Sequence, residues 1–323
     1  MASYRRGAKG PEVERIQGRL REEGLYAGPL DGIFGGGTEA AVRRFQRRRG
    51  LTVDGVVGAL TWAALFPEAE IPEPAIARAP LAQRTLALTG SFETGKPVPE
   101  CFCGISGDFD GQGISFGALQ WNLGQGSLQP LLKKMVSDHP RVTEAVFGAH
   151  TPELQAVLRS SREDQLEWAR SVQDLRRFRL YEPWRGFFKT LGRTPEFQAI
   201  ETDGAQRLYR SAQGLCRRYG VRSQRALALM FDIKVQNGGI PARVRAQIER
   251  DLAQLAPDLP EDEAEPTRLE IIATRRAHAS NPRWVEDVLR RKLTIARGRG
   301  VVHGHHYELD EQYGIGLAPY GRA

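Results

Sequence analysis

Apolar side chains recur at helical spacing along most of the 323-residue chain, and this pattern predicts a mainly α fold. Near the N-terminus, a helix that opens at Pro11 presents one apolar face and ends at Gly24. Thr38 is placed to cap a second helix, and a third helix begins near Leu60. Residues 5–66 are therefore expected to form a compact three-helix unit.

A segment without periodicity separates this unit from a longer helical region. Residues 67–80 are rich in proline and acidic side chains, which is typical of a semi-rigid linker. Beyond it, apolar spacing predicts helices in 81–92, 152–172, 184–191, 195–219, 226–240, 243–255, 266–279 and 284–295. The turn-rich tail from Val301 is expected to lie along a helical surface. The predicted domains are a module at 1–66, the linker at 67–80 and a larger domain at 81–323.

One stretch of the larger domain departs from helical spacing. Residues 91–128 are dense in glycine, and the alternation of apolar residues in 114–119 predicts a short strand. A second glycine turn follows at 122–126. The larger domain is therefore expected to be an α+β domain in which a small β-hairpin accompanies the helices.

The formal net charge of +7 suits an anionic partner such as nucleic acid, acidic lipid or a bacterial wall polymer. The basic residues are spread along amphipathic helices without a nucleic-acid-binding signature, so nucleic acid is not an expected partner. No apolar run has the length of a membrane span, so membrane insertion is not expected. The first residues lack the apolar core of a secretory signal. We expect synthesis in the cytoplasm and release by lysis or a dedicated export machine.

Cysteine and histidine do not indicate a metal centre or a disulfide framework. The three cysteines are an odd count that suggests thiols, and Cys101 and Cys103 are interpreted as small buried residues, with a redox or metal role as the alternative. His303, His305 and His306 would alternate in direction on extended chain and lack a partner ligand pattern. No metal and no cofactor are expected, and the chain is expected to be a monomer.

Two Asp-Gly turns in the N-terminal unit carry a first resemblance. In each, at Asp31 and at Asp54, the aspartate can hydrogen-bond the turn backbone while the glycine takes the positive-φ position. Together with the Phe-Gln of the second helix and the Thr-Trp of the third, they resemble the peptidoglycan-binding domain type 1. The resemblance covers nearly all of residues 5–66 and departs from the usual pattern at the glycine run 35–37. It implies a three-helix module that binds the bacterial wall.

Carboxylates are concentrated in the glycine-rich stretch. Glu93 stands where an apolar helix ends, and Asp108 and Asp110 follow fifteen and seventeen residues later. Cleavage of a glycosidic bond needs one acid to protonate the leaving oxygen and a second carboxylate across the cleft. Glu93 is the expected acid, while Asp108 and Asp110 are rival candidates for the base. The alternative interpretation is a helix terminus followed by two turn-forming aspartates.

The segments DGQGISFGALQWNLGQGSL and FDIKVQNGG carry a second resemblance, to the lysozyme-like superfamily and within it to chitosanases of glycoside hydrolase family 46. This resemblance implies that Glu93 is the general acid, partly desolvated so that its pKa rises. It implies that Asp110 is the general base and that Ser115 helps to position the attacking water. The separation of the carboxylates in such a cleft favours inversion of configuration.

Further side chains are expected to contact the sugar chain. Gln120 resembles the glutamine that lines the sugar site in goose-type lysozymes and lytic transglycosylases. Trp121 is suited to stack on a sugar ring. Asp108, if it is not the base, and Asn237, at the end of an apolar helix, complete the expected substrate-binding set.

These observations predict a peptidoglycan hydrolase that cleaves β-1,4 bonds of the wall glycan. The expected activity is that of an inverting muramidase of the endolysin or antibacterial effector type. Three alternatives stay open: a chitosanase, a lytic transglycosylase and a non-catalytic wall-binding protein. The basic charge argues against the chitosanase, because a cationic polymer favours an acidic cleft.

Overall fold

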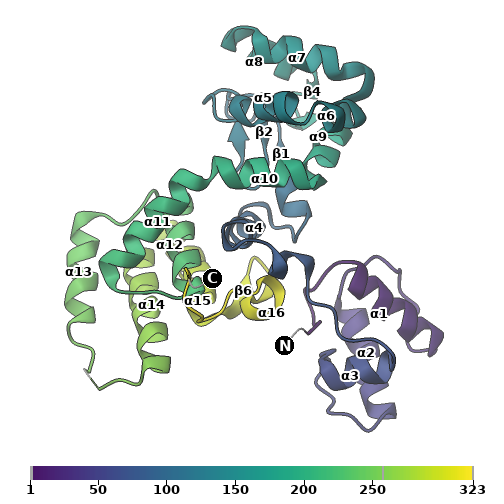
Figure 1. The fold of residues 1–323 in the computed structure, drawn as a ribbon, viewed down its shortest axis with the longest axis vertical. Coiled ribbons are helices and arrows are strands. Elements are labelled where there is room, and N and C mark those ends of the chain that lie inside the picture. The colour runs from purple at the N-terminus through teal and green to yellow at the C-terminus, as the bar shows by residue number, and fades with distance from the viewer. Residues whose placement is uncertain (1–2, 257, 322–323) are drawn as a thin grey trace. The chain divides into compact units, whose positions relative to one another are not determined.

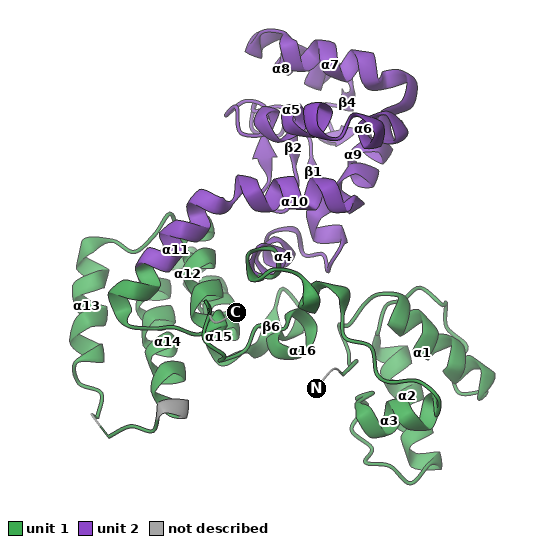
Figure 2. Cartoon of the chain, in the orientation of Figure 1, with its two compact units in different colours: residues 1–84, 215–323 green, residues 85–214 purple. Residues whose placement is uncertain are grey.

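The computed structural model describes residues 3–256 and 258–321. The chain divides into two compact units, one of residues 1–84 and 215–323 and one of residues 85–214 (Figure 2). Helices dominate both units, and the strands of the described residues form three small antiparallel sheets (Figure 1). The predicted mainly α fold with a small hairpin is therefore confirmed. The division into a module, a linker and a larger domain remains a prediction.

The helices of the first unit are α1 (Pro11–Glu22), α2 (Gly36–Arg48), α3 (Ala59–Leu65), η1 (Ala75–Arg78), α12 (Gln224–Asn237), α13 (Ala242–Leu252), α14 (Glu261–His278), η4 (Pro282–Trp284), α15 (Val285–Arg297) and α16 (Leu309–Tyr313). Its sheet pairs β6 (Arg299–Val302) with β7 (His305–Glu308). The unit boundaries fall within α4 (Leu81–Thr94) and α11 (Gln206–Tyr219).

The helices of the second unit are η2 (Glu100–Cys103), α5 (Gln129–Asp138), α6 (Pro140–Phe147), η3 (Gly148–His150), α7 (Thr151–Arg159), α8 (Arg162–Ser171), α9 (Trp184–Arg193) and α10 (Pro195–Gly204). One sheet orders β1 (Ile105–Ser106), β2 (Ser115–Phe116) and β3 (Trp121–Asn122). A hairpin pairs β4 (Gln173–Asp174) with β5 (Arg179–Leu180). Phe116 of the central strand packs against Phe188 and Phe197, and this ties the sheet to α9 and α10.

The three predicted N-terminal helices are confirmed as α1, α2 and α3, which enclose an apolar core of their own. Two similar hydrogen-bonded clasps close this core. Gln17 Nε2 donates to Asp31 Oδ1 at 2.9 Å, to the Ile33 carbonyl at 3.0 Å and to Thr38 Oγ1 at 3.2 Å. Gly32 N donates back to Gln17 Oε1 at 3.0 Å.

The second clasp repeats the first. Gln46 Nε2 donates to Asp54 Oδ1 at 2.7 Å, to the Val56 carbonyl at 2.9 Å and to Thr61 Oγ1 at 3.2 Å. Gly55 N donates to Gln46 Oε1 at 2.9 Å. The clasps confirm the predicted turns, because Ile33 N and Val56 N donate to Asp31 and Asp54 while Gly32 and Gly55 have positive φ.

Thr38 does not cap α2, so that prediction was wrong. The helix begins at Gly36, with Gly35 in the N-cap position, and Thr38 lies buried inside its first turn. Its hydroxyl is instead a partner of Gln17, and the glycines of 35–37 let the helix start earlier than the threonine suggested.

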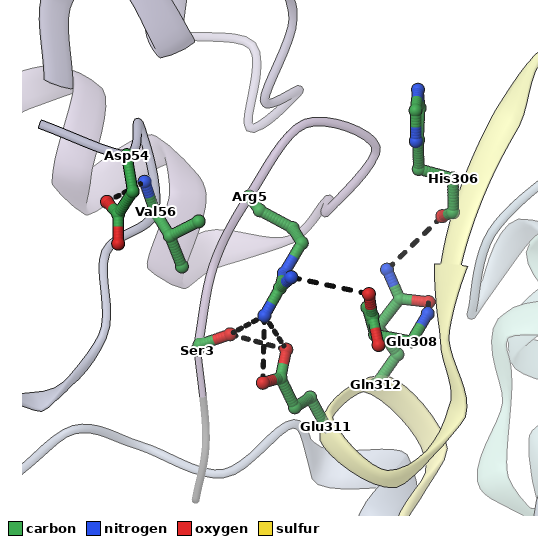
Figure 3. A network of polar contacts seen from close by, with 8 residues as sticks. All are labelled: Ser3, Arg5, Asp54, Val56, His306, Glu308, Glu311 and Gln312. Atoms are coloured by element: carbon green, nitrogen blue, oxygen red, sulfur yellow. Dashed lines mark hydrogen bonds and ion pairs between the residues drawn. The ribbon is translucent and has the colours of Figure 1, made fainter. Parts of the chain in front are cut away.

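Residues 67–80 lie against the module. Tyr4 donates its hydroxyl to the Pro72 carbonyl at 2.7 Å, and Trp62 Nε1 donates to the Ala69 carbonyl at 3.0 Å. The C-terminal tail contacts the N-terminal segment, because Arg5 forms ion pairs with Glu308 at 3.3 Å and with Glu311 at 2.7 Å (Figure 3). The predicted turn-rich tail therefore contains a hairpin and α16, and it contacts the N-terminal segment.

Two predicted helices are each divided in the structure. The stretch 152–172 forms α7 and α8, because Ser161 opens a new helix through a capping box with Asp164. The stretch 195–219 likewise forms α10 and α11. Within the described residues, no helix combines the length and apolar character needed to cross a bilayer.

Candidate active site

The short sheet of the second unit places three polar side chains in one row. Ser106 pairs with Ser115, and Ser115 pairs with Asn122, across adjacent strands. Ser115 is buried in the central strand. The loop of residues 107–114, which joins β1 to β2, carries both candidate aspartates. The predicted residues Asp108, Asp110 and Ser115 are therefore gathered on one sheet and its loop.

Both carboxylate oxygens of Asp108 hold this loop in place through hydrogen bonds. Its Oδ1 accepts a hydrogen bond from Gly113 N at 2.7 Å, and its Oδ2 accepts one from Arg170 Nε at 3.0 Å. The side chain is 5% exposed, so the carboxylate is turned inward although the loop itself is at the surface. Both oxygens of Asp108 thus have structural partners.

Asp110 has a different environment on the same loop. It is exposed, and among the described residues the hydrogen bond recorded to its carboxylate comes from Gln112 N, at 3.1 Å to Oδ1. This is the short local bond of an Asx turn, which leaves most of the carboxylate facing solvent. Asp110 is therefore accessible to a water molecule and a sugar.

Glu93 lies in the last turn of α4. The residues before it, 85–92, are all buried, whereas Glu93 itself is exposed. The structure therefore does not show the expected partial desolvation of Glu93, because the Glu93 side chain is exposed and not on the buried part of α4. Gly90 of the same helix packs closely on Ala118, where a Cβ at Gly90 would lie 2.9 Å from that of Ala118. This close approach fixes the end of α4 against the turn between β2 and β3.

Gln120 belongs to that turn, with φ of 55°. Its Nε2 donates to the Gly117 carbonyl at 2.8 Å, and its Oε1 accepts a hydrogen bond from Ser106 Oγ at 3.1 Å. A non-glycine residue with positive φ is uncommon and needs support of this kind. Trp121 is half-buried, pairs with Phe116 in register and packs on the apolar core.

Asn237 belongs to the first unit, at the last position of α12. Its Oδ1 is buried and has no hydrogen-bond partner among the described residues. The helix ends where expected, at Gly238 in the left-handed conformation.

The sequence interpretation missed a buried acid behind the turn. Glu201 of α10 is fully buried, and its Oε2 accepts a hydrogen bond from Ala118 N at 3.2 Å. Its Oε1 has no partner within the described part of the chain. Burial raises the pKa of Glu201 well above its usual value. A glutamate on the apolar face of a predicted helix, one residue after Ile200, is the signal that could have identified it.

A second buried charge cluster lies in the first unit. Asp232 accepts hydrogen bonds from Arg291, at 2.6 Å to the nearer guanidinium nitrogen, and from the Lys292 ammonium. All three side chains are almost entirely inaccessible to solvent. Lys292 Nζ also donates to Gln236 Oε1 at 2.7 Å. Asp232 and Gln236 are therefore both held in internal hydrogen bonds.

The three cysteines lie in the interior, and His303 lies at the surface. Cys101, Cys103 and Cys216 are buried thiols, and burial raises the pKa of Cys103 to about 12, which disfavours the reactive thiolate. His303 pairs with Asp287 at 2.7 Å. Over residues 3–256 and 258–321, no group of three or more potential ligands is arranged to hold a metal ion.

The N-terminal helices and their paired clasps define a small helical module, and the exposed carboxylates of the second unit define a candidate hydrolytic site. Residues 9–65 match the family model described as "Putative peptidoglycan binding domain". This match confirms the resemblance predicted for the module.

Curated relatives match a limited share of the chain. A spore cortex-lytic enzyme of Bacillus cereus is 52% identical over 56 residues, which are 17% of this chain and 22% of the relative. An N-acetylmuramoyl-L-alanine amidase of Mycobacterium tuberculosis is 38% identical over 76 residues, 20% of this chain and 19% of the relative. The chain thus spans about a fifth of the length of these relatives.

Solved chitosanase structures are similar over a larger share of the chain. The native chitosanase of Bacillus subtilis MY002 is 16% identical, with a TM-score of 0.45 over 71% of this chain and 97% of that one. A family 46 chitosanase of Gynuella sunshinyii, solved with chitotetraose, is 16% identical, with a TM-score of 0.40 over 71% and 98% of the two chains.

Proposed function

We propose that the chain is a peptidoglycan hydrolase that cleaves β-1,4 glycosidic bonds of the bacterial wall. The N-terminal module would hold the wall polymer, and the second unit would supply the cleaving carboxylates. Holding the polymer raises the local concentration of bonds around the site. The match of residues 9–65 to the peptidoglycan-binding model supports the choice of polymer.

The observation that carries the catalytic proposal is the division of roles between two neighbouring aspartates. Asp108 has both oxygens in structural bonds, whereas Asp110 is exposed two residues later. In the proposed reaction, Glu93 protonates the leaving oxygen and Asp110 activates a water on the opposite face of the sugar. Ser115 helps to position that water, and the product is inverted. A bound glycan would displace water from the exposed Glu93 and so provide the desolvation that an acid needs.

The other expected contacts are proposed with the same substrate in view. Gln120, on the turn beside the end of α4, and Trp121, at the start of β3, would line the sugar site. Asn237, on α12 of the first unit, stays a substrate contact predicted from the sequence. The protein would act as a monomer, on a wall reached after lysis or dedicated export. A muramidase of the endolysin or effector type fits this combination.

The proposal is tested by digestion of purified peptidoglycan with wild type, Glu93→Gln and the control Glu167→Gln. Glu167 is an exposed glutamate of α8 outside the proposed site. Mass spectrometry after borohydride reduction should find reducing muramic acid ends with wild type and the control, and none with Glu93→Gln. Reducing glucosamine ends would move the cleaved bond, and anhydro ends would make the enzyme a lytic transglycosylase. Chitosan is digested in parallel. Cleavage of chitosan alone would overturn the proposed substrate, and no cleavage of either polymer would leave a binding protein.

A further inference from the structure

The β4–β5 hairpin presents an exposed patch of guanidinium and aromatic groups. Arg176 and Arg177 lie in its turn and Arg179 on β5, and all three are exposed. Phe178 between them is 42% exposed, and Tyr181 just after β5 is 54% exposed. Soluble proteins seldom leave clustered aromatic side chains in water unless the surface has a partner.

This hairpin is fastened to the loop that carries Asp110. Gly107 N donates to the Phe178 carbonyl at 3.0 Å, and Asp108 N donates to Gln173 Oε1 at 2.8 Å. The two segments approach so closely that a Cβ at Gly107 would lie 2.6 Å from the Phe178 carbonyl oxygen. Only glycine fits such an approach, so the patch has a fixed position beside the catalytic loop.

The loop adds an aromatic side chain of its own. Phe109, between Asp108 and Asp110, is 62% exposed. Phe178 holds a φ of 51°, a conformation that costs free energy in a non-glycine residue and is concentrated at functional sites. Aromatic faces beside a glycosidase carboxylate are suited to stack on sugar rings.

The charge of the patch indicates which sugar chain it fits. The acidic side chain of the hairpin itself is Asp174, whose Oδ1 accepts the backbone N–H groups of Arg176 and Arg177 and so shapes the turn. Asp174 lies 3.9 Å from Arg177 Nε, a contact too long and too exposed to neutralise the group. Among the described residues, Arg176 and Arg179 have no ion-pair partner. Arginine forks bind carboxylates, and they repel a cationic glucosamine polymer.

We propose that the β4–β5 hairpin and Phe109 form a specificity subsite for an anionic glycan, in which the arginines bind carboxylates carried by the sugar chain and the aromatic rings stack on its sugars. This rests on the proposed function and identifies what would select a carboxylate-bearing wall polymer over chitosan. The carboxylates would be those of the stem peptides of peptidoglycan, and those of lactyl ethers that carry no peptide.

The test measures binding apart from cleavage. Glu93→Gln protein, full length, is titrated calorimetrically with soluble, uncross-linked peptidoglycan strands, with the same strands after their carboxyl groups have been amidated, and with chitosan oligosaccharides. In this background R176Q/R177Q/R179Q is compared with R141Q/R159Q/R162Q. The control removes the same charge from three exposed arginines of α6, α7 and α8 with no recorded ion pair in the described structure.

The hairpin variant should bind the carboxylate-bearing strands at least tenfold more weakly, and the control should stay within twofold. Amidated strands should bind both proteins as weakly as the hairpin variant binds the native strands. Equal affinities of the hairpin and control variants for the native strands would overturn the subsite. So would amidation that lowers the affinity of both variants by the same factor, because the hairpin variant should have little carboxylate-dependent affinity left to lose. Wild type that releases no sugar ends, with hairpin-dependent binding intact, would overturn hydrolysis and keep the subsite. Wild type that cleaves peptidoglycan, with an unchanged KM when R176Q/R177Q/R179Q is introduced with Glu93 intact, would keep hydrolysis and overturn the subsite.

Discussion

Gln17 and Gln46 occupy equivalent places in two copies of one hydrogen-bonded clasp. Each is buried on a helix and donates to an aspartate, a carbonyl and a threonine hydroxyl, and each accepts the N–H of the glycine that follows the aspartate. The N-terminal module is therefore built on a repeated polar device as well as an apolar core. Because the glutamine amide at the centre of each network is buried and has partners for its nitrogen and its oxygen, the network favours one arrangement of the helices.

Truncation of either glutamine should destabilise the module strongly. Gln46→Ala removes the donor to Asp54, Val56 and Thr61 and leaves Gly55 N without its acceptor. Loss of these bonds and of a buried donor's partner should cost roughly 3 kcal/mol. Hydrogen exchange over residues 11–65 measures the loss locally, because a chain of several compact parts need not unfold in one step. The exposed neighbour Arg47→Ala should leave protection unchanged, and equal protection in both variants would contradict the role of the clasp.

Asparagine substitutions at the two aspartates of the loop 107–114 should have different effects. Asp110→Asn should lower the rate of wall digestion by about 10²–10⁴-fold with an unchanged melting temperature, because it removes the proposed base from an exposed position. Asp108→Asn weakens the bonds to Gly113 and Arg170 and should loosen residues 107–114, at a local cost of about 1–3 kcal/mol. Digestion rates and hydrogen exchange over the loop decide between them. If Asp108→Asn is inactive with a rigid loop while Asp110→Asn stays active, Asp108 is the base and Asp110 is not.

Local features of this chain were predictable from sequence because their causes are local. The Asp31 and Asp54 turns need only an aspartate, a glycine and the intervening backbone. The predicted helix 152–172 is interrupted at Ser161 by a capping box with Asp164, which is also a local sequence feature. Hydrophobic periodicity alone did not predict this interruption. Apolar spacing identifies which face is buried more reliably than where a helix ends.

The roles of polar side chains depended on partners distant in sequence. Arg170, which holds Asp108, stands 62 residues after it, and Ala118, which holds Glu201, stands 83 residues before it. Thr38 looked like a helix cap because its partner Gln17 lies on another helix. Such contacts are created by tertiary packing, and the sequence around a residue does not identify its partner, even where it marks the residue as buried.

Glu201 should make stability fall as pH rises. Its folded pKa is raised above the ordinary value of 4.5, so the folded chain keeps a proton that the unfolded chain releases. The contribution of the group is therefore complete below about pH 4.5 and declines as pH rises from there toward the folded pKa. Denaturant midpoints of the second unit should decline less from pH 5 to pH 8 in Glu201→Gln than in wild type, because the amide does not titrate. Asp203→Asn, an exposed position of the same helix, is the control. Parallel pH curves for wild type and Glu201→Gln would show that the buried acid does not titrate between the two states.

The buried cluster around Asp232 should tolerate loss of one cation far better than loss of its carboxylate. Asp232→Asn removes the charge that both Arg291 and Lys292 contact, and breaking a buried pair in this way costs about 3–5 kcal/mol. Lys292→Met leaves Arg291 bonded to Asp232 and replaces an ammonium that burial already disfavours.

Burial lowers the pKa of Lys292 to about 8, with Asp232 acting in the opposite direction. Since the unfolded chain then binds this proton more tightly than the folded one, wild type should gain stability between about pH 8 and pH 10.5, and Lys292→Met should not. Urea midpoints at pH 7 should therefore place Lys292→Met within about 1.5 kcal/mol of wild type and well above Asp232→Asn. If both variants unfold equally easily, Lys292 is a structural partner that Arg291 cannot replace.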